Sequence, residues 1–156
     1  MASAPNSESL SRTLIGLLAD AAFVFADTTT TPMPADENPL VARLTLAHDE
    51  TWELCVCVQE KLGDVLAANL LGTESETREA RAASVDALGE LANILAGALA
   101  VELFGKDVVS RIGIPVVTLE TARAVGERLA RSTCWANLLT EEGHALAVAL
   151  TAKGGA

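Results

Sequence analysis

The stretch Asp86-Ala87-Leu88-Gly89-Glu90-Leu91-Ala92-Asn93-Ile94-Leu95-Ala96-Gly97 decides the fold of this chain. It lies within a long apolar run, from about residue 77 to residue 104. Positions 79–103 contain no proline, and alanine and leucine are the most frequent residues there. Such a run predicts a helix. At about 100° per residue, its apolar side chains gather on one side, which we expect to be buried in a core. These side chains are Leu88, Leu91, Ala92, Leu95, Leu99 and Leu103.

A polar stripe follows the opposite side of the same predicted helix. Asp86, Glu90, Asn93 and Gly97 are spaced so that they form one line along the helix surface. Two carboxylates, an amide and a position without a side chain therefore share the solvent face. Such a stripe could enter the active site of another protein, and it is also what an ordinary solvated helix face contains. The stripe alone leaves both interpretations open.

Length and composition bound the class of protein. The chain has 156 residues, of which 50% are hydrophobic, which is enough for one domain with a substantial core. Its net charge of -10 and its pI near 4.5 argue against a nucleic-acid partner and against an anionic membrane surface, because like charges repel. No apolar run is long enough to span a bilayer without a charged interruption, and no secretion signal is recognisable at the N-terminus. We expect a cytoplasmic protein.

The cysteines do not predict a disulfide framework or a metal site. There are three of them, Cys55, Cys57 and Cys134, and an odd count without a signal peptide speaks against disulfides. Cys55 and Cys57 alternate within a strand-like run, so both are expected on one side of a sheet as small buried hydrophobic residues. The two histidines, His48 and His144, each stand alone, so we expect no metal ligands.

The N-terminal part predicts a tail, a helix and a loop. Residues 1–8 are interpreted as a flexible tail. A helix is expected to begin near Ser9 or Ser11, either of which could cap its first turn, and to stop near Asp27. Residues 28–34 are rich in threonine and proline, which predicts a loop.

Two pairs of alternating segments predict two β-hairpins. Residues 40–48 and 51–58 alternate between apolar and polar side chains and are separated by a short polar break. Residues 133–140 and 144–152 form a second such pair. Strands joined by a short turn pair in antiparallel fashion.

A further helix is expected between the first hairpin and the long helix. Residues 60–71 carry leucine and valine at helical spacing, and Gly72 is expected to end this helix. Thr73 and Glu76 have the spacing of a capping box for the long helix that follows.

The segments after the long helix complete the predicted fold. The apolar run 108–119 predicts a strand, which Pro115 confines to a sheet edge or a bulge because proline cannot donate a hydrogen bond. Residues 120–131 are compatible with a short helix or with a loop that covers an edge. Hairpins together with grouped helices indicate an α+β fold, in which helices pack on one face of a largely antiparallel sheet. We expect residues 9–153 to form one domain.

The motif on the long helix resembles that of a known family. The pattern Asp-x-x-x-Glu-x-x-Asn at 86–93, followed by Pro115 at the start of a strand-like run, resembles the signature of the CheX-type chemotaxis phosphatases, which are relatives of CheC and FliY. Residues 21–25, Ala-Ala-Phe-Val-Phe, resemble part of the first helix of stand-alone CheX-like domains. The turn at 140–143 between two strands fits as well. CheC-like relatives carry two such motifs and this chain carries one, so the CheX-like branch is the better analogue.

The resemblance implies an activity and a role for each residue of the stripe. CheX-like proteins dephosphorylate CheY-like response regulators. Asn93 would orient the attacking water, because an amide both accepts and donates hydrogen bonds and does not change charge with pH. Glu90 would pair with a lysine of the regulator, Asp86 would lie at the periphery of the contact, and Gly97 would let the partner backbone approach. The chain would need no cofactor of its own, since Mg²⁺ belongs to the regulator. A homodimer formed through the sheets is also implied.

Three functions from different classes remain open at this point. The chain could be an aspartyl-phosphate phosphatase, a module that binds a response regulator without hydrolysis, or a structural or dimerisation domain whose motif is a remnant. Substitution of Asn93 separates the first two, because a phosphatase should lose turnover while it keeps binding.

Overall fold

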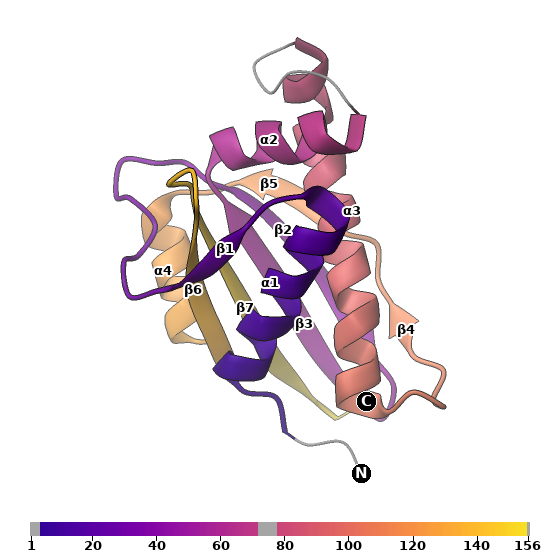
Figure 1. The fold of residues 1–156 in the computed structure, drawn as a ribbon. Coiled ribbons are helices and arrows are strands. Elements are labelled where there is room, and N and C mark those ends of the chain that lie inside the picture. Colours follow the sequence, from indigo (N-terminus) through magenta and orange to yellow (C-terminus); the bar gives the residue numbers. More distant parts are fainter. Residues whose placement is uncertain (1–3, 72–77, 156) are drawn as a thin grey trace.

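The computed structural model describes residues 4–71 and 78–155 (Figure 1). These residues form helices and strands in the following order: α1 (Ser7–Ala22), β1 (Ala26–Thr29), β2 (Leu40–Ala47), β3 (Glu50–Val58), α2 (Glu60–Leu71), α3 (Arg78–Phe104), β4 (Arg111–Ile112), β5 (Val116–Leu119), α4 (Ala122–Ala130), β6 (Cys134–Thr140) and β7 (Ala145–Gly155). The predicted α+β class is confirmed. The capping box expected at Thr73 and Glu76, and the helix end expected at Gly72, lie outside the described residues.

One antiparallel sheet organises the fold. Its strand order is β1-β6-β7-β3-β2-β4, and β5 pairs with the first half of β2, whereas β4 pairs with its end. Both predicted hairpins are present, as β2 with β3 and as β6 with β7. The last strand continues to Gly155, which pairs opposite Glu50, and so extends past the predicted domain end at residue 153.

The main core lies between one face of the sheet and helices α1 and α3, which lie in front of it in Figure 1, and helix α2 packs on α3 and covers the top end of this core. Alternate residues of the strands point into this core, among them Leu44, Leu54 and Val148. The predicted apolar side of α3 is buried there, with Leu103 only partly covered. Burial of this side chain row contributes most of the stabilisation of α3, because apolar area removed from water is the main favourable term in folding.

Helix α3 also satisfies a length and composition test for membrane spans. Within the described residues, Ala83–Phe104 is the one helical stretch long and apolar enough to cross a bilayer. Its leucine side is already packed on the sheet, and its other side carries the acidic and amide residues of the stripe. These features are those of the central helix of a globular core.

A smaller core lies on the opposite face of the sheet. Helix α4 packs there on Cys55, Cys57 and the alanines of β7, and the hydrophobic residues of this second core are Met33, Val41, Cys55, Cys57, Ala122, Val125, Leu129, Ala145, Ala147 and Ala149. Residues 120–131 therefore contain the helix, not the loop, of the two alternatives. The three larger helices share one face of the sheet, as expected, and among the described helices only the short α4 lies on the other. The two cysteines point to one side of the sheet as buried hydrophobic residues, as expected.

The N-terminal segment differs from its prediction. Helix α1 begins at Ser7, earlier than Ser9, because the Asn6 side chain accepts a hydrogen bond from the Ser9 amide (2.8 Å). It ends at Ala22, well before Asp27, because Phe23 adopts a left-handed conformation (φ 55°) that a helix cannot continue. The loop predicted for 28–34 is wrong for its first two residues, which belong to strand β1 and pair with β6.

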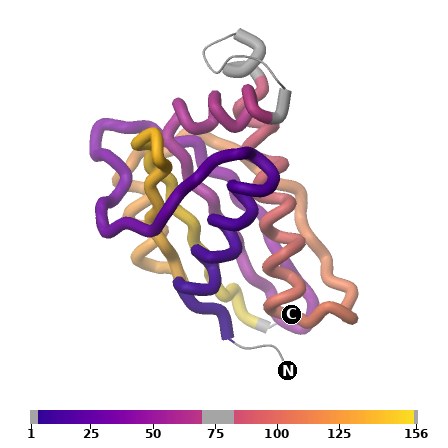
Figure 2. Tube along the Cα trace, viewed as in Figure 1, coloured from indigo at the N-terminus to yellow at the C-terminus, as the bar shows by residue number. Residues whose placement is uncertain are grey.

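The single strand predicted for 108–119 is also wrong. The structure has two short strands there, β4 and β5, and both pair with β2 at the edge of the sheet. Pro115 lies between them, where no ladder hydrogen bond is required of it. Figure 2 shows this orange segment running beside α3.

Candidate functional site

Helix α3 presents the polar stripe to solvent. Asp86, Glu90 and Asn93 are all exposed, and Gly97 is partly exposed on the same line. The intervening Leu88, Leu91 and Leu95 are buried against the sheet, which fixes the rotation of the helix about its axis. The stripe therefore faces outward because the opposite side of the helix is committed to the core.

The edge of the sheet forms a second wall opposite the stripe. Ile112 pairs with Leu46 of β2 and Val116 pairs with Arg43. Ile112 and Val116 are four residues apart in the sequence, but their partners are only three residues apart. One extra residue therefore sits in this edge, which makes residues 113–115 a β-bulge. The bulge is held in place because the Gly113 amide donates a 2.8 Å hydrogen bond to the Thr45 carbonyl.

A groove of about 450 Å³ lies between these two walls. Asp86, Glu90 and Asn93 line one side, and the bulge residues line the other; the full lining is Val85, Asp86, Gly89, Glu90, Asn93, Ile112, Gly113, Ile114, Pro115 and Val117. The walls come close at Gly89, where an added Cβ would lie 3.7 Å from Val117 Cγ2. Gly97 does not line the groove.

The polar side chains of the groove have no partners within the described part of the chain. Neither Glu90 nor Asn93 makes a hydrogen bond or ion pair there, and the same holds for Asp86. The groove lining carries two carboxylates and no lysine, arginine or histidine. Its hydrogen-bonding groups and its negative charge are therefore available to a molecule that enters from solvent.

Sequence reasoning identified the helix wall and missed most of the sheet wall. Ile112, Gly113 and Ile114 belong to the groove, yet the sequence pattern placed them inside one continuous strand. Pro115 was the available signal, because a proline within a strand pattern indicates an edge or a bulge. A glycine two residues before it strengthens that signal.

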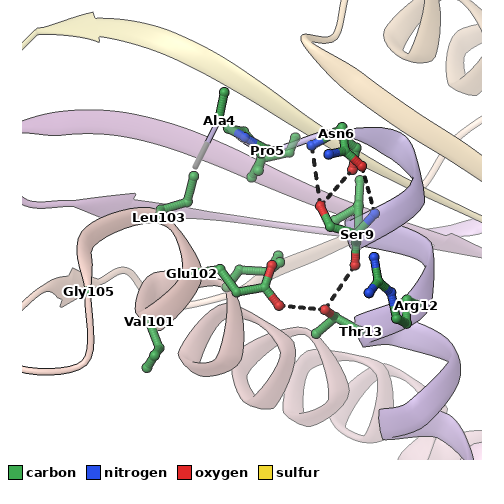
Figure 3. A pocket seen from close by; sticks show the side chains of 13 residues that line it. Ala4, Pro5, Asn6, Ser9, Arg12, Thr13, Val101, Glu102, Leu103 and Gly105 are labelled. Carbon is green, nitrogen blue, oxygen red and sulfur yellow. Dashed lines mark hydrogen bonds between the residues drawn. The ribbon is translucent and has the colours of Figure 1, made fainter. Parts of the chain in front are cut away.

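A larger cavity, of about 660 Å³, lies away from the stripe, between the beginning of α1 and the end of α3 (Figure 3). Its polar groups largely bind one another: Asn6 and Ser9 form a capping box, and the Thr13 hydroxyl lies 2.6 Å from a carboxylate oxygen of Glu102. The capping box stabilises the start of α1 and the Thr13–Glu102 hydrogen bond joins α1 to α3, so the polar groups of this cavity have structural roles. We therefore place the candidate site at the smaller groove.

The described residues contain no cluster of side chains that could bind a metal ion. No group of three or more histidine, cysteine, aspartate or glutamate side chains converges among them. Cys55 and Cys57 lie with their sulfur atoms 3.5 Å apart beneath α4, away from the groove. The Cys57 pKa is raised well above its usual value, first by the hydrogen bond with Cys55 and then by burial, so this thiol stays neutral.

Comparison with solved structures shows the same fold in chemotaxis proteins. CheX from Desulfovibrio desulfuricans is 11% identical with a TM-score of 0.66, over 94% of this chain and 98% of that one. CheX from Vibrio vulnificus is 15% identical with a TM-score of 0.65, over 92% and 94%. The CheX of a CheX–CheY–BeF3–Mg²⁺ complex from Borrelia burgdorferi is 15% identical with a TM-score of 0.64, over 93% and 96%.

A family model, and not an individual relative, identifies the family from the sequence. A comparison with curated protein sequences yields no match. The model of the family described as chemotaxis phosphatase CheX matches residues 40–137, which is more than half of the chain and spans both walls of the groove. The chain belongs to the CheX family of chemotaxis phosphatases.

Proposed function

We propose that this protein hydrolyses the aspartyl phosphate of a CheY-like response regulator, with Asn93 as the catalytic residue. The observation that carries the proposal is an exposed amide without a partner, held on a rigid helix at the rim of an acidic groove. The CheX family and the fold shared with a CheX crystallised with CheY support the choice of substrate.

The amide of Asn93 suits the positioning of water. Its carbonyl oxygen can accept a hydrogen bond from the water, and its amino group can donate one to a phosphoryl oxygen. The water oxygen attacks phosphorus in line, the bond from phosphorus to the regulator aspartate breaks, and inorganic phosphate and a free carboxylate are released. Because the acyl phosphate is already reactive, placing the water supplies much of the catalysis.

The other residues of the stripe serve the docking of the regulator. Glu90, one turn before Asn93, is free to pair with a lysine beside the phosphorylated aspartate, and a charged pair of this kind sets orientation as well as affinity. Asp86 extends the acidic surface at the periphery. Gly97 leaves room for the partner backbone, since nothing lies within 4 Å of the Cβ position there. The Mg²⁺ ion belongs to the regulator, so the chain needs no cofactor of its own.

The test is phosphate release from purified receiver domains phosphorylated on aspartate, with wild type compared to Asn93→Ala and Glu90→Ala. Asn93→Ala should lower turnover by roughly 100-fold and leave the affinity for the receiver nearly unchanged. Glu90→Ala should weaken docking by at least about tenfold. Asn38→Ala, which removes an exposed amide from a loop outside the groove, is the matched control.

The outcomes separate the three functions. If wild type binds a receiver without accelerating phosphate loss, the chain is a binding module. If neither substitution on α3 changes binding or turnover, the motif is a remnant in a structural domain. A loss of turnover in Asn38→Ala equal to that in Asn93→Ala would point to general damage and would remove the support for a catalytic amide.

We also propose a cytoplasmic location and a homodimer formed through the sheet. The β1 edge lies at the opposite end of the sheet from the groove and is preceded by Phe23 and Phe25, which are exposed. Pairing through that edge would leave both grooves open to regulators. Light scattering on wild type and on Phe25→Asp tests this, because the charge should shift a dimer toward monomer.

A further inference from the structure

We propose that Ile114, at the tip of the bulge, is a docking residue that packs on an apolar surface of the receiver domain next to its phosphorylation site. The proposal rests on the function proposed above and deepens it. It assigns the sheet wall of the groove a role in recognition, whereas the α3 wall supplies the chemistry.

The bulge aims Ile114 away from the protein. In a regular strand, residue 114 would alternate with its neighbours and lie on the sheet; the extra residue breaks this alternation between Ile112 and Val116. Ile114 is 88% exposed, although Pro115 and Gly113 on either side of it are partly covered. Bulges recur next to active sites because they redirect a side chain in this way.

The exposed side chain contributes nothing to the core. An isoleucine in this position is unusual, because solvent-facing turns are normally occupied by polar residues or glycine. Val85 and Ile112, which line the same groove, are also exposed, by 43% and 38%. Together they form an apolar rim around Glu90 and Asn93, and contiguous apolar surface beside a polar site is typical of protein recognition.

Continuity and charge point to a receiver domain as the occupant. The apolar rim and the unpaired stripe line one groove, so a protein surface that fills the groove contacts both Asn93 and Ile114. The charged members of the lining, Asp86 and Glu90, are both acidic. The complementary surface is therefore apolar with a basic side chain beside it, and a second copy of this chain, with a net charge of -10, is a poor match.

The first experiment compares Ile114→Asp with Val109→Asp in the phosphatase assay. Val109 is 90% exposed and does not line the groove, so it is a matched control for placing a carboxylate on exposed apolar surface. Ile114→Asp should raise KM for the phosphorylated receiver by roughly 10- to 100-fold, as expected for one lost isoleucine contact, and leave kcat unchanged. Val109→Asp should match wild type, and both variants should unfold at the wild-type temperature.

A second experiment does not depend on turnover. A photoactivatable benzophenone amino acid at position 114 should crosslink to the receiver domain, and the same group at position 109 should not. If wild type hydrolyses the phosphorylated receiver, but positions 114 and 109 give the same KM and the same crosslinking, the docking role of Ile114 is overturned and the phosphatase function stands. Crosslinking at 114 without hydrolysis by wild type overturns the phosphatase and keeps the docking surface. Crosslinking of 114 to a second copy of this chain assigns the rim to self-association and overturns the proposal.

Discussion

Gly113 lies so close to Thr45 that no other residue fits in its place without movement. A Cβ atom added at Gly113 would be 2.8 Å from Thr45 Oγ1 and 3.4 Å from the Thr45 amide nitrogen. The same pair is joined by the hydrogen bond from the Gly113 amide to the Thr45 carbonyl. The position of the whole sheet wall of the groove therefore depends on a glycine at one end of the bulge.

Gly113→Ala should destabilise the protein and displace the bulge. We expect a loss of about 1–3 kcal/mol in the free energy of unfolding, the usual cost of forcing an extra carbon into a close contact. Gly126→Ala on the exposed side of α4, where nothing lies within 4 Å of the Cβ position, should instead stabilise by about 0.5–1 kcal/mol. Urea denaturation measures both. The double variant Gly113→Ala/Thr45→Ala should recover much of the loss, and no recovery would contradict the clash.

Gly97 gives a case in which stability and activity should move in opposite directions. Gly97→Gln replaces a mid-helix glycine with a good helix former, and the Cβ position is open, so we expect a gain of about 0.5–1 kcal/mol. The long side chain should nevertheless obstruct a regulator that approaches the stripe, and KM should rise. Gly16→Gln in α1, which is equally open, should give the same gain with unchanged kinetics. Wild-type KM in Gly97→Gln would exclude close backbone approach at this position.

The helix wall of the site could be predicted from sequence because its determinants are local. The periodicity of Leu88, Leu91 and Leu95 on one side fixes the direction of Glu90 and Asn93 on the other, whatever the helix packs against. The two hairpins were predictable for the same reason, because each joins neighbouring segments across a short turn.

The sheet wall and the N-terminal segment could not be predicted, because their determinants are distant in sequence. The bulge exists only through the register of β4 and β5 against β2, which lies about seventy residues earlier in the chain. Strand β1 likewise exists through pairing with β6. The end of α1 depends on Phe23 in a left-handed conformation, where a glycine would have announced the helix end.

Arg128 should hold α4 in place through Glu120, just before the helix, and through Glu53 of strand β3, whose Oε1 lies 3.9 Å from Arg128 Nη1. One of its terminal nitrogens, Nη2, lies 2.7 and 2.8 Å from the two carboxylate oxygens of Glu120, and both side chains are mostly covered. Arg128→Met should cost about 1–3 kcal/mol of unfolding free energy, as expected for charge-assisted hydrogen bonds shielded from water. The exposed pair Arg123 and Glu127, 3.4 Å apart, provides the control, and Arg123→Met should cost less than about 0.5 kcal/mol. Equal losses in the two variants would contradict this anchoring role.

The buried thiol of Cys57 should make the protein less stable in alkaline solution. Its pKa is raised in the folded state by the hydrogen bond with Cys55 and by burial, so the unfolded chain loses this proton first as the pH rises. The folded state then binds more protons than the unfolded state, and the free energy of unfolding falls with pH from about pH 8.5, the ordinary thiol value, up to the folded-state pKa. Below that window the thiol makes no pH-dependent contribution.

The variant Cys57→Ala lacks the titrating group, so the free energy of unfolding of this variant should fall less steeply than that of wild type between about pH 8 and 10. Urea titrations at each pH measure the two slopes, and parallel curves for the two proteins would show that Cys57 is not the group responsible.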